Sequence, residues 1–202
     1  MSHSLVLVRH GETEWSATGK HTGLTDVDLT ETGERQARAL EPVLAAYQGC
    51  PAWSSPLQRA RRTAELAGLG DVTVDRDLLE WDYGAYEGRT TEEISHEIGK
   101  PWSIWQDGVE AAGGESLASL AGRAARVLAR ATPLVAAGGD VALVGHGHAL
   151  RVLAATWLGL DPAAASLLAL SPGSVSALGF EHDRHVLARW NVRPSDVVPH
   201  LG

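Results

Sequence analysis

The sequence predicts an α/β fold of three layers, in which a mostly parallel central sheet with an antiparallel edge strand lies between two layers of helices. Two short apolar runs rich in β-branched residues, Leu5–Val8 and Val141–Val144, are typical of strands buried on both faces. Helical patterns separate the strand candidates, and this alternation is typical of parallel sheets. The last two candidates, Ser174–Phe180 and Val186–Trp190, are joined by a polar turn and predict a strand pair.

The helices are predicted from their caps and prolines. Thr30 can cap a helix that runs to about Ala46, and Pro56 stands at the first turn of one that runs to about Ala67. A long helical pattern follows Ser116, which Pro133 should bend or end early. The other predicted elements are, in order, the weaker strands Ala52–Ser54 and Val72–Val74, the end of the long helix at Ala136, and a helix from Ala149 to Leu158.

Composition predicts one domain and excludes several classes of protein. The 202 residues suit a single domain over residues 1–193, followed by a tail over 194–202 whose prolines predict an extended or disordered arm. The single cysteine, Cys50, excludes an internal disulfide and a cysteine-based metal cluster. A net charge of −8 argues against a general nucleic-acid surface. We find no apolar run of the length of a signal peptide or membrane span, so we expect a cytoplasmic protein without a membrane partner.

Two strand candidates end in a His-Gly pair. The first runs into Arg9, His10 and Gly11, and the last buried one runs into His146 and Gly147. Ligands in open α/β sheets bind beyond the carboxyl ends of the strands. The apolar residues therefore belong to the sheet, and the polar residues that follow them predict a site.

The residue types in this predicted site suit phosphoryl transfer. Arg59 lies near the start of the predicted helix that begins at Pro56. If it converges with the two His-Gly pairs, the guanidinium forks of Arg9 and Arg59, with a protonated histidine, match the oxygens of a phosphoryl group. A neutral histidine can attack phosphorus with one ring nitrogen while the other donates to a backbone carbonyl. Gly11 and Gly147 allow the backbone to approach the ligand. The departing alkoxide also needs a proton, so we expect a carboxylic acid nearby.

Five segments together resemble the histidine phosphatase superfamily, the branch that includes the cofactor-dependent phosphoglycerate mutases, over residues Leu5 to about Asn191. They read "VRHGETEW", "HTGLTDVDLTETG", "SSPLQRARRTAE", "LLEWDYGAYEG" and "VGHGHALR". The resemblance implies a phosphoglycerate mutase-like fold and a phosphorylated nucleophile at His10. It also implies the following roles: Arg9 and Arg59 as clamp arginines, Glu80 as general acid, His146 as second phosphate-binding histidine, and Thr22 and Gly23 as lining of the phosphate site.

Further residues are candidates beside these. Ser16 and Gly147 are expected at the phosphate site. Asp82, two residues from Glu80, is an alternative to it or shares its role. Accessory positions are expected for His148, His21 and Trp81.

Three departures from the mutase pattern favour hydrolysis. Ser16 replaces the asparagine of the mutases, and Trp81 replaces the arginine that follows their acidic residue. The stretch from Arg89 to Glu115 is short and acidic, whereas the mutases carry a longer insertion with paired arginines. We therefore predict a broad-specificity phosphatase of acid phosphatase character that favours acidic pH. The alternatives are a phosphoglycerate mutase and a dedicated sugar-phosphate or phosphoglycerate phosphatase.

The predicted chemistry uses a small phosphate ester and needs neither a metal nor a cofactor, because the cationic clamp takes the metal's place. A metal-dependent hydrolase with His10, His146, His148 and a carboxylate as ligands is a rival, although arginines beside a cation disfavour it. A second rival is a binding module on a degenerate phosphatase fold. Members of the family that the sequence resembles are often dimeric, so a homodimer is a further alternative.

Overall fold

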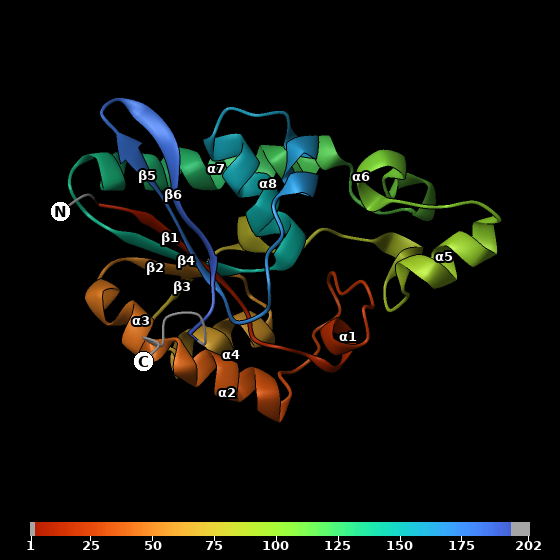
Figure 1. Cartoon of the computed structure of the whole chain (residues 1–202), viewed down its shortest axis with the longest axis horizontal. Coiled ribbons are helices and arrows are strands. Elements are labelled where there is room, and N and C mark those ends of the chain that lie inside the picture. The colour runs from red at the N-terminus through yellow and green to blue at the C-terminus, as the bar shows by residue number, and fades with distance from the viewer. Residues whose placement is uncertain (1–2, 195–202) are drawn as a thin grey trace, which may run out of the picture.

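The computed structural model describes residues 3–194 and contains one six-stranded sheet in the order β3-β2-β4-β1-β5-β6 (Figure 1). The strands are β1 (Leu5–Arg9), β2 (Ala52–Ser54), β3 (Thr73–Val74), β4 (Val141–Gly145), β5 (Val175–Glu181) and β6 (Arg184–Val192). Parallel pairing joins β3 to β2, β2 to β4 and β4 to β1, while β5 is antiparallel to both β1 and β6. The predicted mostly parallel sheet with an antiparallel hairpin at one edge is confirmed.

Helices cover both faces of the sheet (Figure 1). Successive side chains of β1 point to opposite faces, and each pair enters a different core. Leu5 and Leu7 pack in a cluster with the buried residues of α7 (Leu117–Ala136) and α8 (Gly147–Trp157). Val6 and Val8 pack in a second cluster on the opposite face. That cluster includes Leu40, which joins α2 (Glu31–Ala39) to α3 (Glu41–Leu44), and buried residues of α3 and α4 (Gln58–Leu66).

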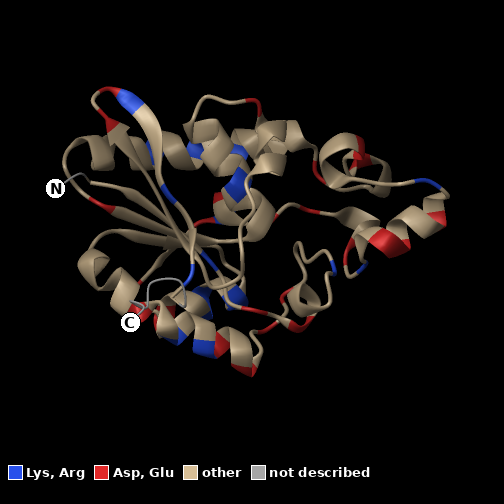
Figure 2. Cartoon of the chain, viewed as in Figure 1, with Lys and Arg blue, Asp and Glu red and all other residues tan. Residues whose placement is uncertain are grey.

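Short elements extend the molecule beyond the carboxyl ends of the parallel strands (Figure 1). They are α1 (Glu14–Ala17), α5 (Thr91–Ile98) and α6 (Ile104–Asp107), with the 3₁₀ turns η3 (Gly84–Tyr86) and η4 (Glu110–Ala112). The acidic residues of α5 belong to this extension (Figure 2). The loop after α1 is tied to it, because the amide of His21 donates to the carbonyl of Arg89 at 2.8 Å. The remaining 3₁₀ turns are η1 (Ala45–Tyr47), η2 (Arg76–Leu78) and η5 (Pro162–Leu167).

Prolines account for two departures from the predicted helices. The helix capped by Thr30 is divided at Leu40 into α2 and α3, since Pro42 in the first turn of α3 has no N–H to continue the ladder. Pro133 does not end α7, which continues to Ala136, so an early end there was wrong. Placed in the last turn, this proline removes the one hydrogen bond to the carbonyl of Ala129, and the helix continues for only three residues beyond it.

The remaining boundaries differ slightly from the prediction. Helix α8 begins at Gly147, two residues earlier than expected, directly after the second His-Gly pair. In the described part of the chain, no helix is long and apolar enough to cross a bilayer. The predicted tail over 194–202 lies, beyond Pro194, outside the described residues.

Candidate active site

A cavity of about 190 Å³ lies where the parallel strands end. The described residues that line it are Arg9, His10, Ser16, Gly19, Lys20, His21, Thr22, Glu80, Tyr83, Gly147, His148, Arg151 and Leu170. They come from the ends of β1 and β4, from the start of α8 and from the extension beyond the sheet. The two strand-terminal motifs therefore meet at one site.

His10 is fixed at the end of β1, and one of its ring nitrogens has a hydrogen-bond partner while the other has none within residues 3–194 and is free to react. Its amide donates to the carbonyl of Gly145 at 3.1 Å, and its side chain is 4% exposed. The Nδ1 atom lies 2.7 Å from the carbonyl oxygen of Gly11, an acceptor, so Nδ1 carries the ring hydrogen. Burial lowers the pKa of His10 well below its usual value, and the charges of Arg59 and Arg9 lower it further. His10 is thus a neutral imidazole with a lone pair on Nε2.

Gly11 leaves no room for a side chain. A Cβ placed there would lie 2.3 Å from the carbonyl oxygen of Gly33, within α2. The Gly11 amide donates to the hydroxyl of Thr63 on α4 at 3.1 Å. Close packing of three segments therefore fixes the carbonyl that orients the His10 ring.

Arg9 is a half-buried cation whose guanidinium has unused donors. Its Nη1 donates to the carbonyl of Leu170, while Nε has no hydrogen-bond partner among the described residues. Burial lowers the pKa of Arg9 from its usual value, which still leaves an arginine charged in neutral solution. Gly147 allows the close approach of this side chain, because a Cβ there would lie 3.2 Å from the Arg9 Cζ. A charged guanidinium that lines the cavity without a carboxylate partner in the described part of the chain suits an anionic ligand.

Arg59 and His146 meet His10 but lie outside the lining that the described residues define. Arg59 donates from Nε to Nδ1 of His146 at 3.2 Å, and its other nitrogens donate to the carbonyls of Thr22, Gly23 and Thr25. Nε2 of His146 lies 2.7 Å from the Ser55 hydroxyl, and the rings of His146 and His10 have centroids 5.1 Å apart. The sequence placed both residues directly on the phosphate; the structure commits most of their donors to protein acceptors.

His146 is also not the protonated histidine that the sequence suggested. Burial lowers its pKa well below the usual value, followed by the charge of Arg59. A ring whose Nδ1 accepts a hydrogen bond from a guanidinium is neutral and carries its hydrogen on Nε2. A charged His146 is therefore corrected to a neutral one.

Glu80 is the carboxylate of the described cavity lining. It is 4% exposed and accepts three backbone N–H groups: Oε1 from Trp81 at 2.9 Å and Ala149 at 2.8 Å, and Oε2 from His148 at 3.0 Å. Two of these donors belong to the first turn of α8, where the helix dipole favours negative charge. The carboxylate is thereby placed beside the second His-Gly motif.

The other candidates divide between the cavity and its surroundings. Ser16, Thr22, Gly147, His21 and His148 line the cavity. The described lining omits Gly23, Trp81 and Asp82. Each of these three has a local structural contact: the Gly23 amide donates to Glu87, the fully buried Trp81 indole donates to the carbonyl of Glu115, and Asp82 accepts from the amide of Gly84. Of the two acids weighed from the sequence, only Glu80 reaches this lining.

Sequence reasoning missed three polar residues of the cavity, namely Lys20, Tyr83 and Arg151. Arg151 lies one helical turn after Gly147 on α8, and that spacing is the signal that would have placed it there. Its Nε donates to the carbonyl of Ala165 at 3.0 Å, and its guanidinium lies 4.7 Å from the centre of the Trp105 ring. The hydroxyl of Tyr83 lies 2.7 Å from Nδ1 of His148.

The charge balance of the cavity is positive although the protein is acidic. Arg9, Lys20 and Arg151 line it and form no ion pair with a carboxylate among the described residues, against the single carboxylate of Glu80. Seven other described arginines pair with acidic side chains, most of them at exposed positions. The excess of cations suits a phosphate dianion. A cluster of three or more side chains able to hold a metal ion is not found in residues 3–194.

Comparisons with known proteins agree with this chemistry. Residues 5–193 match the family model of the histidine phosphatase superfamily, branch 1. A Mycobacterium tuberculosis protein named acid phosphatase is 41% identical over 189 residues, which cover 93% of this chain and 91% of that protein. A Salmonella paratyphi C protein named probable phosphoglycerate mutase GpmB is 34% identical, covering 96% and 93%. The solved structure of a Mycobacterium tuberculosis open reading frame superposes with a TM-score of 0.88 at 39% identity, covering 96% and 100%.

Proposed function

The chain belongs to branch 1 of the histidine phosphatase superfamily, and from this we propose that it hydrolyses phosphate monoesters through a phosphohistidine on His10. The observation that carries the proposal is the neutral His10 ring, held by Gly11 and placed in a cavity that the guanidinium of Arg9 also lines. The identity to an acid phosphatase supports hydrolysis, the reaction that the sequence also favours.

In the first step, Nε2 of His10 attacks phosphorus. The new N–P bond forms as the ester P–O bond breaks, and the departing oxygen takes a proton from the carboxylic acid form of Glu80. The Nδ1 hydrogen stays on the ring and donates to the Gly11 carbonyl, which stabilises the positive charge that develops on the imidazole.

In the second step, the carboxylate of Glu80 accepts a proton from a water molecule as that water attacks the phosphohistidine. The N–P bond breaks, inorganic phosphate forms, and the bonding electrons return to Nε2 of His10. Asp82 is assigned no part in this cycle, since its carboxylate caps the turn at Gly84 instead.

Arg9 binds the phosphoryl oxygens through guanidinium N–H groups that donate to no acceptor among the described residues, and it stays in contact through both steps. Arg59 and His146, which lie outside the described cavity lining, act through their effect on His10 and on the neighbouring loop. The charge of Arg59 helps to keep the nucleophile neutral and supplies positive potential, and its contacts hold the loop of Thr22 and Gly23. Ser16, Thr22 and Gly147 form the wall of the phosphate site, with His21 and His148 toward the leaving group.

The finer properties remain proposals. Breadth of specificity, a preference for acidic pH, activity without metal and a cytoplasmic location rest on the sequence. A mutase is the second candidate, favoured by the 34% identity to the protein named GpmB. A mutase has to bind a highly anionic substrate, and the acidic surface of α5 opposes this.

The test measures initial rates on an aryl phosphate and on 3-phosphoglycerate, with and without 2,3-bisphosphoglycerate and with EDTA. Wild type and His10→Ala are compared from about pH 4 to 8. We expect phosphate release that EDTA leaves unchanged and that the variant loses. Rapid formation of 2-phosphoglycerate would instead establish a mutase, and inhibition by EDTA would establish a metal-dependent enzyme.

A further inference from the structure

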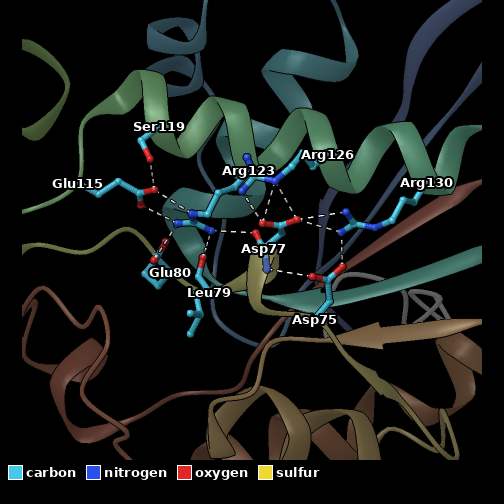
Figure 3. Close-up of polar contacts among 9 residues, drawn as sticks. All are labelled: Asp75, Asp77, Leu79, Glu80, Glu115, Ser119, Arg123, Arg126 and Arg130. Atoms are coloured by element: carbon cyan, nitrogen blue, oxygen red, sulfur yellow. Dashed lines mark hydrogen bonds and ion pairs between the residues drawn. The ribbon is translucent and has the colours of Figure 1, made fainter.

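The segment that carries Glu80 is held by a side chain from α7 (Figure 3). Glu80 lies between η2 and η3, outside any helix or strand. Arg123 donates from Nη1 to the carbonyls of Asp77 at 2.8 Å and Leu79 at 2.9 Å, and from Nη2 to the carbonyl of Glu80 at 3.2 Å. Within the described residues, no other hydrogen bond reaches the carbonyls of Leu79 and Glu80. The main chain at Glu80 therefore depends on this guanidinium.

Arg123 is in turn fixed by Glu115 (Figure 3). Two contacts join them, from Nε to Oε1 at 2.9 Å and from Nη2 to Oε2 at 2.7 Å, and the two side chains are 13% and 14% exposed. Burial raises the pKa of Glu115, but the hydrogen bond and charge of Arg123, together with further hydrogen bonds, outweigh it and leave that pKa below the usual value. Ser119 donates to the same carboxylate at 2.8 Å. A bidentate pair of this kind holds one geometry.

Glu115 also holds the chain on the far side of Glu80. Its amide donates to the carbonyl of Asp82 at 2.9 Å, and its carbonyl accepts from the indole of Trp81 at 2.6 Å. Arg123 and Glu115 together thus bind the main chain or side chain of every residue from Leu79 to Asp82.

We propose that Arg123, fixed by Glu115, is a positioning residue that places the Glu80 carboxyl for proton transfer to the leaving group. The inference rests on the proposed role of Glu80. The main chain of Glu80 is set from α7, and its carboxylate is set by the amides of α8. Without the hydrogen bond from Arg123, only the carboxylate of Glu80 is held in place, and its main chain can move. A displacement of about 1 Å in a reacting group can cost about 10²-fold in rate.

Two neighbours on α7 provide a matched control (Figure 3). Arg126 and Arg130 extend from the same helix to the same turn, but they bind the carboxylates of Asp77 and Asp75. Their side chains are 58% and 46% exposed. Exposed ion pairs of this kind contribute little, and neither arginine contacts Leu79 or Glu80.

The test compares kcat/KM on two monoesters, p-nitrophenyl phosphate and glycerol 2-phosphate, in Glu80→Gln, Arg123→Ala and Arg126→Ala. Nitrophenolate departs with little need of a proton, whereas a glycerol alkoxide requires one. Since kcat/KM reports the first irreversible step, the ratio between the two substrates isolates proton donation. We expect Arg123→Ala to lose about 10- to 100-fold on the glycerol ester and less than about 3-fold on the aryl ester. Arg126→Ala should retain the wild-type ratio.

Three outcomes decide the matter. A substrate-dependent loss in both Glu80→Gln and Arg123→Ala, absent in Arg126→Ala, supports the inference. An equal loss on both substrates in a folded Arg123→Ala, with Glu80→Gln still selective, overturns the positioning role and leaves the function of Glu80 intact. A non-selective Glu80→Gln overturns the role of Glu80 itself, and the inference with it. If Arg123→Ala does not fold, Arg123→Lys decides, because it keeps the charge beside Glu115 without the fork that reaches the carbonyls.

Discussion

The Nδ1 atom of His10 lies 2.7 Å from the carbonyl oxygen of its neighbour Gly11. This contact decides which end of the ring can react, since a carbonyl only accepts and Nδ1 must donate. The lone pair is then on Nε2. The proposed attack on phosphorus requires this orientation together with the neutral state of the ring.

The acid side of the pH profile reports that neutral state. The pKa of His10 lies well below 6.5 because of burial and the charges of Arg59 and Arg9. The proposed nucleophile is neutral above this pKa and protonated below it, so its own reactivity is lost only as pH falls through the lowered value. We expect the acid limb of kcat/KM to have its midpoint below pH 6.5. A midpoint at or above pH 6.5 would contradict the assigned environment of His10.

A side chain at Gly11 should disturb both stability and catalysis. The Cβ of Gly11→Ala would lie 2.3 Å from the backbone oxygen of Gly33, which has no flexible end to move aside. We expect a loss of about 1–3 kcal/mol in the free energy of unfolding, with a fall in kcat. Gly122→Ala is the control, because a Cβ at that position of α7 meets nothing closer than 3.9 Å. That variant should be slightly more stable than wild type in urea denaturation; equal behaviour of the two variants would refute the packing argument.

Replacing Arg59 by lysine removes a fork that has several acceptors. A lysine cannot serve the carbonyls of Gly23 and Thr25 together with Nδ1 of His146, so buried acceptors are left unpaired. We expect Arg59→Lys to lose about 2–3 kcal/mol in the free energy of unfolding. Arg62→Lys, three residues further on α4 and paired with Glu34 and Glu65 at the surface, should change by less than about 1 kcal/mol. Denaturant titration of the two variants measures the difference, and equal losses would speak against a structural role of Arg59.

The two lysines of the chain allow a test of the charge at the cavity. Lys20 lines the cavity. Lys100 does not belong to the described lining, and its Nζ pairs with Oδ1 of Asp107 at a distance of 3.0 Å. We expect Lys20→Ala to raise KM for a sugar bisphosphate about twofold to fivefold more than KM for an aryl monophosphate. The difference should shrink at high salt. The same variant at Lys100 should show no such difference, and a Lys20 variant that changes both KM values equally would place the lysine outside the substrate's field.

The sequence was sufficient to predict the carboxyl ends of β1 and β4 to within one residue. Leu5–Val8 and Val141–Val144 are apolar enough to be read as buried strands, and their parallel pairing brings His10 and His146 to one edge. The membership of the superfamily confirms the family that the motifs indicated. Each of these patterns can be read from a few consecutive residues, and parallel pairing of the two strands brings the residues that follow them together.

Other features depended on contacts between distant segments. The hydrogen-bond donors of Arg59 are used by carbonyls of the loop at 22–25. The position of Arg59 in the sequence does not indicate these contacts. The distinction between Glu80 and Asp82 depends on which carboxylate reaches the amides of α8. Arg123 belongs to an ordinary amphipathic helix, so its contact with the Glu80 segment has no signature in the chain.

The central claim is that Nε2 of His10 becomes phosphorylated during turnover. Wild type and Glu80→Gln are mixed with an aryl phosphate and quenched in base, which preserves phosphohistidine, and the modified residue is located by mass spectrometry. The account predicts one phosphoryl group on His10, present in larger amount in Glu80→Gln because hydrolysis of the intermediate lacks its base. Hydrolysis that continues with no phosphoenzyme in either protein, or a phosphoryl group on a different residue, would contradict it.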